Sequence, residues 1–186
     1  DHLDQRGVAW RSLVTNLVEL QSQVGRTLIR DDIVAPGPAR AALATLGDEA
    51  TLYEVLALAD LLKPSKAAVA ELLPGEGEDP LRMARALRDR FGCKAVVVTD
   101  GEAGCAISTD GYEGQVAALP AKLVDTTGAG DAFLGGLLVA LHHRLDWESA
   151  GLFANACGAA CCEQLGAFPE AADRARARVL ELYPRE

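Results

Sequence analysis

The stretch with the clearest chemical content is 125–133, which reads DTTGAGDAF. Between Asp125 and Asp131 it holds only threonine, glycine and alanine, and an apolar run follows it directly. This pattern predicts a loop that leads into the amino end of a helix, where backbone N–H groups lack partners and the charge is roughly +0.5. Such a helix end can hold an anion. The expected donors to a transferring phosphate are the amides of Gly128, Ala129 and Gly130.

Asp131 follows these amides and would lie in the first turn of the helix. A carboxylate in this place can accept the proton of an alcohol that attacks phosphorus, which predicts phosphoryl transfer from a nucleotide to a sugar-like hydroxyl. The alternative is that Asp131 only complements the positive helix end, while the glycines allow close packing. Two other phosphate motifs are excluded: no G-x-x-x-x-G-K-S/T string occurs, and a dinucleotide fingerprint would need glycine where Phe133 stands.

Strand and helix patterns alternate along the chain around this motif. The β-branched run AVVVT at 95–99 predicts a strand covered on both faces, and Asp110–Gly111 predicts a hairpin turn. Ser65 and Asp79–Pro80 are helix-start signals, and Gly92 is a helix-end signal. The expected helices lie at 10–24, 39–47, from 52 onward, 66–73, 80–91, 131–145, 147–166 and 172–183, and the expected strands at 27–29, 59–64, 95–99, 104–109 and 112–120. We therefore expect a layered α/β fold with a mostly parallel sheet, in a single domain over 1–186.

The composition restricts the partners that the chain can bind. It has 186 residues, of which 49% are hydrophobic, enough to build a sizeable core. Its 18 Lys and Arg are outnumbered by 27 Asp and Glu, and the net charge of -9 argues against nucleic acid and anionic membrane surfaces. No apolar run approaches the ~20 residues of a membrane span, and the opening DHLDQRGVAW lacks a signal-peptide pattern. The cysteines show no C-x-x-C spacing, so we expect free thiols in a soluble, cytoplasmic protein.

With these motifs in place, the chain resembles the ribokinase-like, or PfkB-type, carbohydrate kinases. DTTGAGDAF is similar to their C-terminal signature, and three further segments agree with it in order and spacing. ALADLLKPS resembles the strand before their magnesium motif, VVVTDGEAG their nucleotide-binding T-x-G-x-x-G, and ANACGAACCEQLGA their late helix. The resemblance covers about residues 26–170. It implies the C-terminal half of a layered α/β/α fold, truncated at its N-terminus and without the family's β lid.

The resemblance also implies a role for each matching position. Asp131 would be the catalytic base of an ATP-dependent sugar kinase that uses Mg2+, with 128–130 as its anion hole. The residues implied in the nucleotide pocket are Thr99, Gly101, Gly104 and, near the adenine, Asn155. Asp125 and the backbone of Thr127, with Gly166 as a further contributor, would hold the K+ that some members use. The structural alternatives are a turn between two strands at 99–104, a satisfied polar residue at Asn155, and a cap or turn residue at Asp125.

The chain departs from the family's pattern in three places. The family's N-terminal part, which carries most of the sugar pocket, has no counterpart here. Where the family usually has N-x-x-E to organise magnesium, the chain reads Ser65-Lys66-Ala67-Ala68, so metal organisation is expected to weaken. Lys66 would offset some phosphate charge. LIRDDIVAP differs from the D-P-N-x-R-like segment that the resemblance leads us to expect, and Asp31 and Asp32 are both candidates for the role of its aspartate.

Three functions follow as hypotheses. The first is an ATP-dependent carbohydrate kinase that transfers the γ-phosphate to a sugar hydroxyl. Its expected partners are a sugar and ATP, with either a second copy in a homodimer or an N-terminal portion that was cleaved, lies on another chain or is not in this sequence. The second is a degenerate kinase-like protein that binds nucleotide or a protein partner without turnover, motivated by Ser65 and Ala68. The third is a structural or interaction module that kept the fold.

Overall fold

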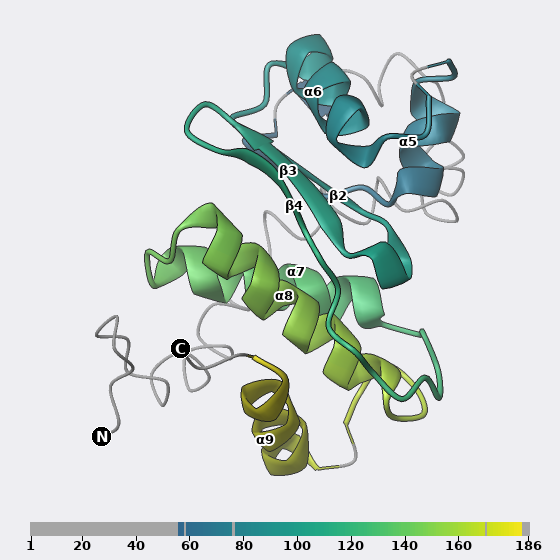
Figure 1. Cartoon of the computed structure of the whole chain (residues 1–186), viewed down its shortest axis with the longest axis vertical. Helices are drawn as coiled ribbons and strands as arrows, with labels where there is room; N and C mark the ends of the chain where they lie inside the picture. Colours follow the sequence, from purple (N-terminus) through teal and green to yellow (C-terminus); the bar gives the residue numbers. More distant parts are fainter. Residues whose placement is uncertain (1–55, 58, 76, 170, 184–186) are drawn as a thin grey trace. The chain divides into compact units, whose positions relative to one another are not determined.

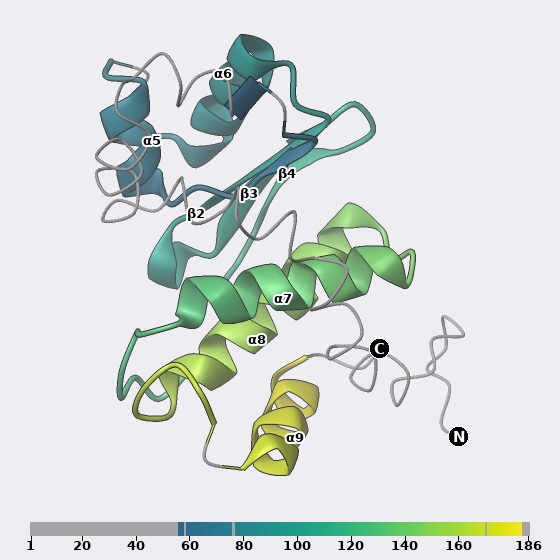
Figure 2. The same cartoon turned by 180° about the vertical axis from the view of Figure 1, so that it is seen from behind.

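The computed structural model describes residues 56–57, 59–75, 77–169 and 171–183. The elements expected at 10–24, 27–29 and 39–47 lie outside the described residues, as do Asp31, Asp32 and the start of the helix expected from 52. The described residues form two compact units, one ending at Val116 and the other beginning at Ala117 (Figures 1 and 2). The single domain over 1–186 stays a prediction.

The unit that ends at Val116 contains a sheet of four described strands in the order β1-β2-β3-β4. The strands are β1 (Leu61–Leu62), β2 (Ala95–Thr99), β3 (Cys105–Thr109) and β4 (Glu113–Val116). β1 runs parallel to β2, and a bridge between Ser65 and Thr99 extends this pairing. β2, β3 and β4 are antiparallel neighbours, with Val97 opposite Ile107 and Ile107 opposite Gly114. The hairpin predicted between β3 and β4 is therefore confirmed.

Two helices of this unit begin at the residues that the sequence indicates. They are α5 (Lys66–Leu72) and α6 (Pro80–Phe91). α6 also ends where predicted, and α5 ends one residue earlier than predicted. Ser65 Oγ accepts a hydrogen bond from the Ala68 amide at 3.2 Å, and Asp79 Oδ1 accepts one from the Leu81 amide at 3.1 Å. Gly92 ends α6 in the left-handed conformation, with φ of 68°. These contacts satisfy backbone groups that a helix end leaves unpaired.

Burial of apolar side chains between α5, α6 and the sheet forms the core of this unit. α6 packs on β2 and β3. Val96 and Val98 belong to the core cluster, together with Leu87 and Met83 of α6 and Val69 of α5. Because strand side chains alternate between faces, these two valines point toward the helices, while Val97 is completely buried on the other face. The continuous apolar run at 95–99 therefore reflects a strand covered on both faces, as predicted.

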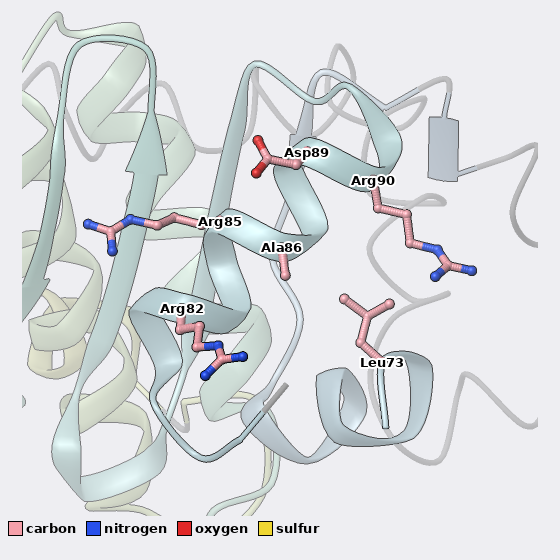
Figure 3. Close-up of a pocket in the computed structure, with 6 residues that line it drawn as sticks. All are labelled: Leu73, Arg82, Arg85, Ala86, Asp89 and Arg90. Carbon is pink, nitrogen blue, oxygen red and sulfur yellow. The ribbon is translucent and has the colours of Figure 1, made fainter. Parts of the chain in front are cut away.

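A hollow on α6 is rich in arginine (Figure 3). The residues that line it are Leu73, Arg82, Arg85, Ala86, Asp89 and Arg90. Arg85 extends away from the hollow toward β4, where its guanidinium pairs with Glu113 at 2.8 Å. None of the residues predicted for the phosphate or nucleotide site line this hollow.

The unit that begins at Ala117 is helical in its described part. Its helices are α7 (Ala129–His142), α8 (Trp147–Cys162) and α9 (Ala172–Leu182). α7 and α8 lie side by side, and α9 packs on α8 (Figures 1 and 2). Asp146 starts α8 by accepting a hydrogen bond from the Ser149 amide at 2.9 Å. Across the described residues of both units, no helix is long and apolar enough to cross a membrane.

Gly136 of α7 lies tightly against α8, and we expect any side chain there to be destabilising. A Cβ at this position would lie 2.6 Å from Cys157 Sγ and 3.2 Å from Ala154 Cα. Gly136→Ala should therefore lower the free energy of unfolding by about 1–3 kcal/mol, although alanine is the better helix former. Urea unfolding measures the change. Gly135→Ala is the matched control: a Cβ there meets nothing within 4 Å, so this variant should gain about 0.5–1 kcal/mol. Equal effects of the two variants would contradict the assignment.

Candidate active site

The loop 125–130 leads into the amino end of α7, as the sequence predicts. α7 begins at Ala129, two residues before the predicted start, so Asp131 lies in its first turn and is exposed to solvent. Gly128 precedes the helix in the left-handed conformation with φ of 78°, and no described side chain caps this end. Of the three amides predicted to hold an anion, that of Ala129 donates to the Thr126 carbonyl at 3.1 Å. The helix end nevertheless keeps its positive partial charge, which favours an anion next to Gly128.

The carboxylate of Asp125 organises this loop through three hydrogen bonds. Its Oδ1 accepts from the Thr127 amide at 2.9 Å and from Thr127 Oγ1 at 2.8 Å. Its Oδ2 accepts from the Gly166 amide at 2.8 Å. The Thr127 and Gly166 amides, in that order, hold the pKa of Asp125 below its ordinary value of 3.8. These bonds show Asp125 as a turn residue, and its role at a K+ site with Thr127 stays a prediction.

Gly128 is needed for a steric reason as well as a conformational one. A Cβ on Gly128 would lie 2.5 Å from Ala167 Cβ and 2.8 Å from Ala167 Cα. The loop is therefore pressed against the segment that follows α8, and the Asp125–Gly166 hydrogen bond joins the same two segments. The sequence named Gly166 only through the family resemblance and did not indicate Ala167, because no local pattern signals a contact between segments this far apart.

The hydrogen bonds of Asp125 predict a pH-dependent contribution to stability. Because its folded-state pKa is depressed, this contribution is present above the ordinary pKa of 3.8 and is lost as the pH falls through the folded-state pKa. Urea unfolding of the unaltered protein and of Asp125→Asn should show the variant to be less stable at pH 7. The difference should shrink below pH 3.8. A difference that stays constant from pH 7 to pH 3 would contradict the role of this carboxylate.

Two thiols, the buried Cys161 and the half-buried Cys162, lie beside the same loop. The Cys161 thiol donates to the Thr127 carbonyl at 3.5 Å, a contact that the sequence did not predict. Burial raises the pKa of Cys161, with smaller contributions from Cys162, Asp125 and Asp131. Burial likewise raises the pKa of Cys162. Both thiols therefore stay protonated at neutral pH, and Cys161 acts as a hydrogen-bond donor that holds the loop rather than as a nucleophile.

Thr99, Gly101 and Gly104 form one tight turn between β2 and β3, in the unit that contains the sheet. Gly101 and Gly104 have φ of 51° and 97°, values that favour glycine. The Asp100 amide donates to the Gly104 carbonyl at 2.8 Å, which closes the turn. Thr99 Oγ1 donates to the Pro64 carbonyl at 3.4 Å and so ties the turn to the end of β1. The spacing of these residues is explained by the turn itself, and their contact with a nucleotide stays a prediction.

Asn155 lies on α8 and is almost completely buried. Its side-chain amide donates to the Ala117 carbonyl at 3.0 Å, so it ties α8 to the start of the loop that leads to 125–130. This is the satisfied polar residue that the sequence offered as an alternative. A contact of Asn155 with the adenine of a nucleotide stays a prediction.

The segment that departs from the family's magnesium motif does not fit a metal site. Ser65 uses its hydroxyl to cap α5, and Ala68 is completely buried in the core. Lys66 Nζ pairs with Asp100 Oδ2 at 3.0 Å, so an ammonium group lies at the carboxyl ends of β1 and β2. Within the described residues, no group of three or more His, Cys, Asp or Glu side chains is arranged to hold a metal ion. Ala68 therefore supplies no side-chain ligand for Mg2+, and the Ser65 hydroxyl is engaged at the start of α5.

The start of α7, where no described side chain caps the helix, can bind an anion such as phosphate through its backbone N–H groups, and Asp131 lies in its first turn. The sequence model of the pfkB family carbohydrate kinases matches residues 39–172. The chain therefore belongs to this family, which confirms the resemblance inferred from its motifs.

Similar proteins and solved structures agree with this assignment. Fructokinase-2 of Oryza sativa subsp. japonica is 41% identical over 118 residues, which are 60% of this chain and 34% of that protein. A fructokinase from Vibrio cholerae O395, solved in a fructose, ADP and calcium ion bound form, is 32% identical with a TM-score of 0.60. That match covers 73% of this chain and 44% of the fructokinase.

A protein from E. coli described as a ribokinase II, solved with ATP and Mg2+, is 27% identical with a TM-score of 0.65. The match covers 79% of this chain and 47% of that one. These structures confirm the ribokinase-like α/β fold. The chain spans about a third of the length of the curated relatives it matches.

Proposed function

We propose that the chain carries the phosphate-transfer part of an ATP-dependent carbohydrate kinase, with Asp131 as the base. The observation that carries this proposal is the start of α7. Gly128 begins the helix without a capping side chain, and Asp131 stands exposed in the first turn. Family membership supports a carbohydrate as acceptor, and the ligands named for the solved relatives, fructose with ADP and ATP with Mg2+, support a nucleotide as donor.

The proposed reaction moves one phosphoryl group and one proton. The hydroxyl oxygen of the sugar forms a bond to the γ-phosphorus of ATP, the bond from that phosphorus to the β–γ bridging oxygen breaks, and ADP leaves. The proton of the hydroxyl passes to the carboxylate of Asp131. Backbone N–H dipoles at the start of α7, from Gly128 onward, stabilise the negative charge on the transferring oxygens.

We propose further roles for the remaining site residues. Thr99, Gly101 and Gly104 would contact the nucleotide, and Asn155 would lie on its adenine side. Asp125 and the backbone of Thr127 would hold K+, although three hydrogen bonds already occupy most of the roughly four acceptor positions of that carboxylate. No step is assigned to Mg2+ on Ser65 or Ala68, because the Ser65 hydroxyl caps α5 and Ala68 has no polar side-chain atom.

Release of ADP in a coupled assay tests the proposed reaction. The whole chain is incubated with ATP, Mg2+, K+ and each member of a panel of sugars and polyols, with fructose, ribose and inositol among them. We expect ADP release that depends on at least one of these acceptors. Calorimetry with ATP and with ADP is run in parallel, so that binding and turnover are measured separately.

A nucleotide-binding protein without turnover is the second candidate. The burial of Ala68 and the commitment of Ser65 to capping α5 favour it, because both positions lack the groups that would organise a metal–phosphate complex. Nucleotide binding without acceptor-dependent ADP release would support this candidate over the kinase. Absence of nucleotide binding would contradict both.

A further inference from the structure

The segment that leads into the 125–130 loop is held along its backbone by the end of α8. The amides of Val124 and Asp125 both donate to the Cys162 carbonyl, at 2.8 Å and 3.2 Å. The Lys122 amide donates to Glu163 Oε1 at 3.1 Å. Cys162, the last residue of α8, and Glu163, which caps the helix, therefore fix the path of the chain just before Asp125.

Glu163 is in turn held by α9. Arg178 grips its carboxylate with a two-pronged contact, Nε to Oε2 at 2.6 Å and Nη2 to Oε1 at 2.8 Å. The third guanidinium nitrogen, Nη1, donates to Glu181 Oε2 on the same helix at 3.1 Å. Oε1 of Glu163 therefore accepts from both Arg178 and the Lys122 backbone, and the side chain of Glu163 is only 17% exposed.

The position of Glu163 explains why it needs Arg178. Glu163 caps the carboxyl end of α8, where the helix has negative partial charge and a carboxylate is unfavourable. The guanidinium of Arg178 offsets this repulsion with charge-assisted hydrogen bonds. These bonds are the main reason that the pKa of Glu163 lies below its ordinary value of 4.5. Without Arg178 the carboxylate would lose its main stabilising partner and would keep only the weaker contributions of the Lys122 amide and the Lys122 charge.

We propose that Arg178 and Glu163 are positioning residues that hold the 125–130 loop in its observed form through the 122–125 backbone. Arg178 of α9 holds Glu163, and Glu163 holds the backbone at Lys122. This backbone leads to Asp125, whose carboxylate fixes Thr127 just before Gly128. Neither residue touches the reacting atoms. The proposed effect on the loop does not depend on the proposed function, whereas the proposed effect on turnover rests on it.

Amide hydrogen exchange of the whole chain, resolved by residue with NMR, tests the effect on the loop. Arg178→Ala should speed exchange of the Lys122, Val124 and Asp125 amides about three- to tenfold, the range expected for a partly exposed ion pair that supports a charge-assisted hydrogen bond. Exchange at Val97, in β2, should stay unchanged. Arg176→Ala is the matched control, because it removes the same charge from an exposed position of the same helix.

Arg178→Lys separates loss of the contact from damage to α9. Lysine keeps the charge and the helix propensity but cannot form the two-pronged contact, so exchange at Lys122 should fall between that of the unaltered protein and that of Arg178→Ala. If Arg178→Ala and Arg178→Lys exchange no faster at 122–125 than Arg176→Ala, the proposal is overturned.

Nucleotide calorimetry and the ADP-release assay test the consequence for function. In Arg178→Ala we expect turnover to drop by on the order of 10- to 100-fold, since small displacements of a reactive group are costly. The Arg176→Ala control should keep its turnover. Faster exchange with unchanged nucleotide affinity and turnover would overturn the functional part of the proposal. If the unaltered chain neither binds nucleotide nor releases ADP, the proposed function fails, while the exchange rates still decide whether this ion pair holds the loop.

Discussion

Replacing Asp131 with asparagine is expected to lower acceptor-dependent ADP release by about 100- to 10,000-fold, the range typical for loss of a general base. The amide keeps the size of the side chain but cannot take up the proton of the sugar hydroxyl. Nucleotide affinity should change little, because the proposed contacts to the phosphates come from the backbone at the start of α7. The coupled assay and calorimetry measure the two quantities on the same samples.

Asp173 offers a matched control for this experiment. Like Asp131 it is an exposed aspartate in the first turn of a helix, in this case α9. If Asp131 only complemented the helix end, Asp131→Asn and Asp173→Asn would each cost a little stability and leave turnover intact. Full activity of Asp131→Asn would therefore remove Asp131 from the proposed mechanism.

Gly128→Ala is expected to have the second large effect, on both stability and nucleotide binding. The left-handed φ of 78° costs a non-glycine residue about 1–2 kcal/mol, and the new Cβ would meet the Ala167 backbone at 2.8 Å. The loop must shift away from Ala167 to relieve the contact. This shift would move the start of α7, where the phosphate is proposed to bind. Urea unfolding and calorimetry with ATP measure the two losses.

Comparison with Gly166→Ala separates the steric part of the Gly128→Ala effect from the conformational part. Gly166 has the same φ of 78°, but a Cβ there meets nothing within 4 Å. The conformational cost should therefore be shared by both variants. The additional loss in Gly128→Ala, about 1–3 kcal/mol, would come from the contact with Ala167. Equal losses in the two variants would show that the contact with Ala167 does not matter.

Local signals explain the parts of the fold that could be predicted from the sequence. Ser65 and Asp79 cap α5 and α6, and Gly92 ends α6, because each residue satisfies backbone groups within a few positions of itself. The hairpin at Asp110–Gly111 is equally local. Such contacts depend on short-range chemistry that a single sequence displays.

The carboxyl end of α8 shows why other features could not be predicted. The sequence pattern extends this helix to Gly166, but α8 ends at Cys162. In a longer helix the Gly166 amide would donate to the Cys162 carbonyl. Here that carbonyl accepts from Val124 and Asp125, and the Gly166 amide donates to Asp125 Oδ2 instead. A tertiary contact across about 40 residues competes with helix propagation, and no local pattern indicates it.

In the candidate site, too, some features could be predicted from the sequence and others could not. The glycines and aspartates of 125–131 were recognisable because their types and spacing suit phosphate chemistry. The contacts that hold them were not: Ala167 behind Gly128, the Cys161 thiol on Thr127, and the ion pair of Arg178 with Glu163 all come from segments remote in sequence. Ala68 also needed the structure, since only its complete burial shows that it faces the core.

β4, the last strand in the order of the described sheet, has features that bear on pairing between molecules. β4 is short, and its Glu113 is held in place by Arg85 at 2.8 Å and by Ser108 at 2.9 Å. Gln115, also exposed on β4, bonds to Asp79 at 3.2 Å. Since a short strand with a fixed charge is a poor template for pairing, we expect β4 to add a strand of a neighbouring molecule less readily than a long uncharged strand would.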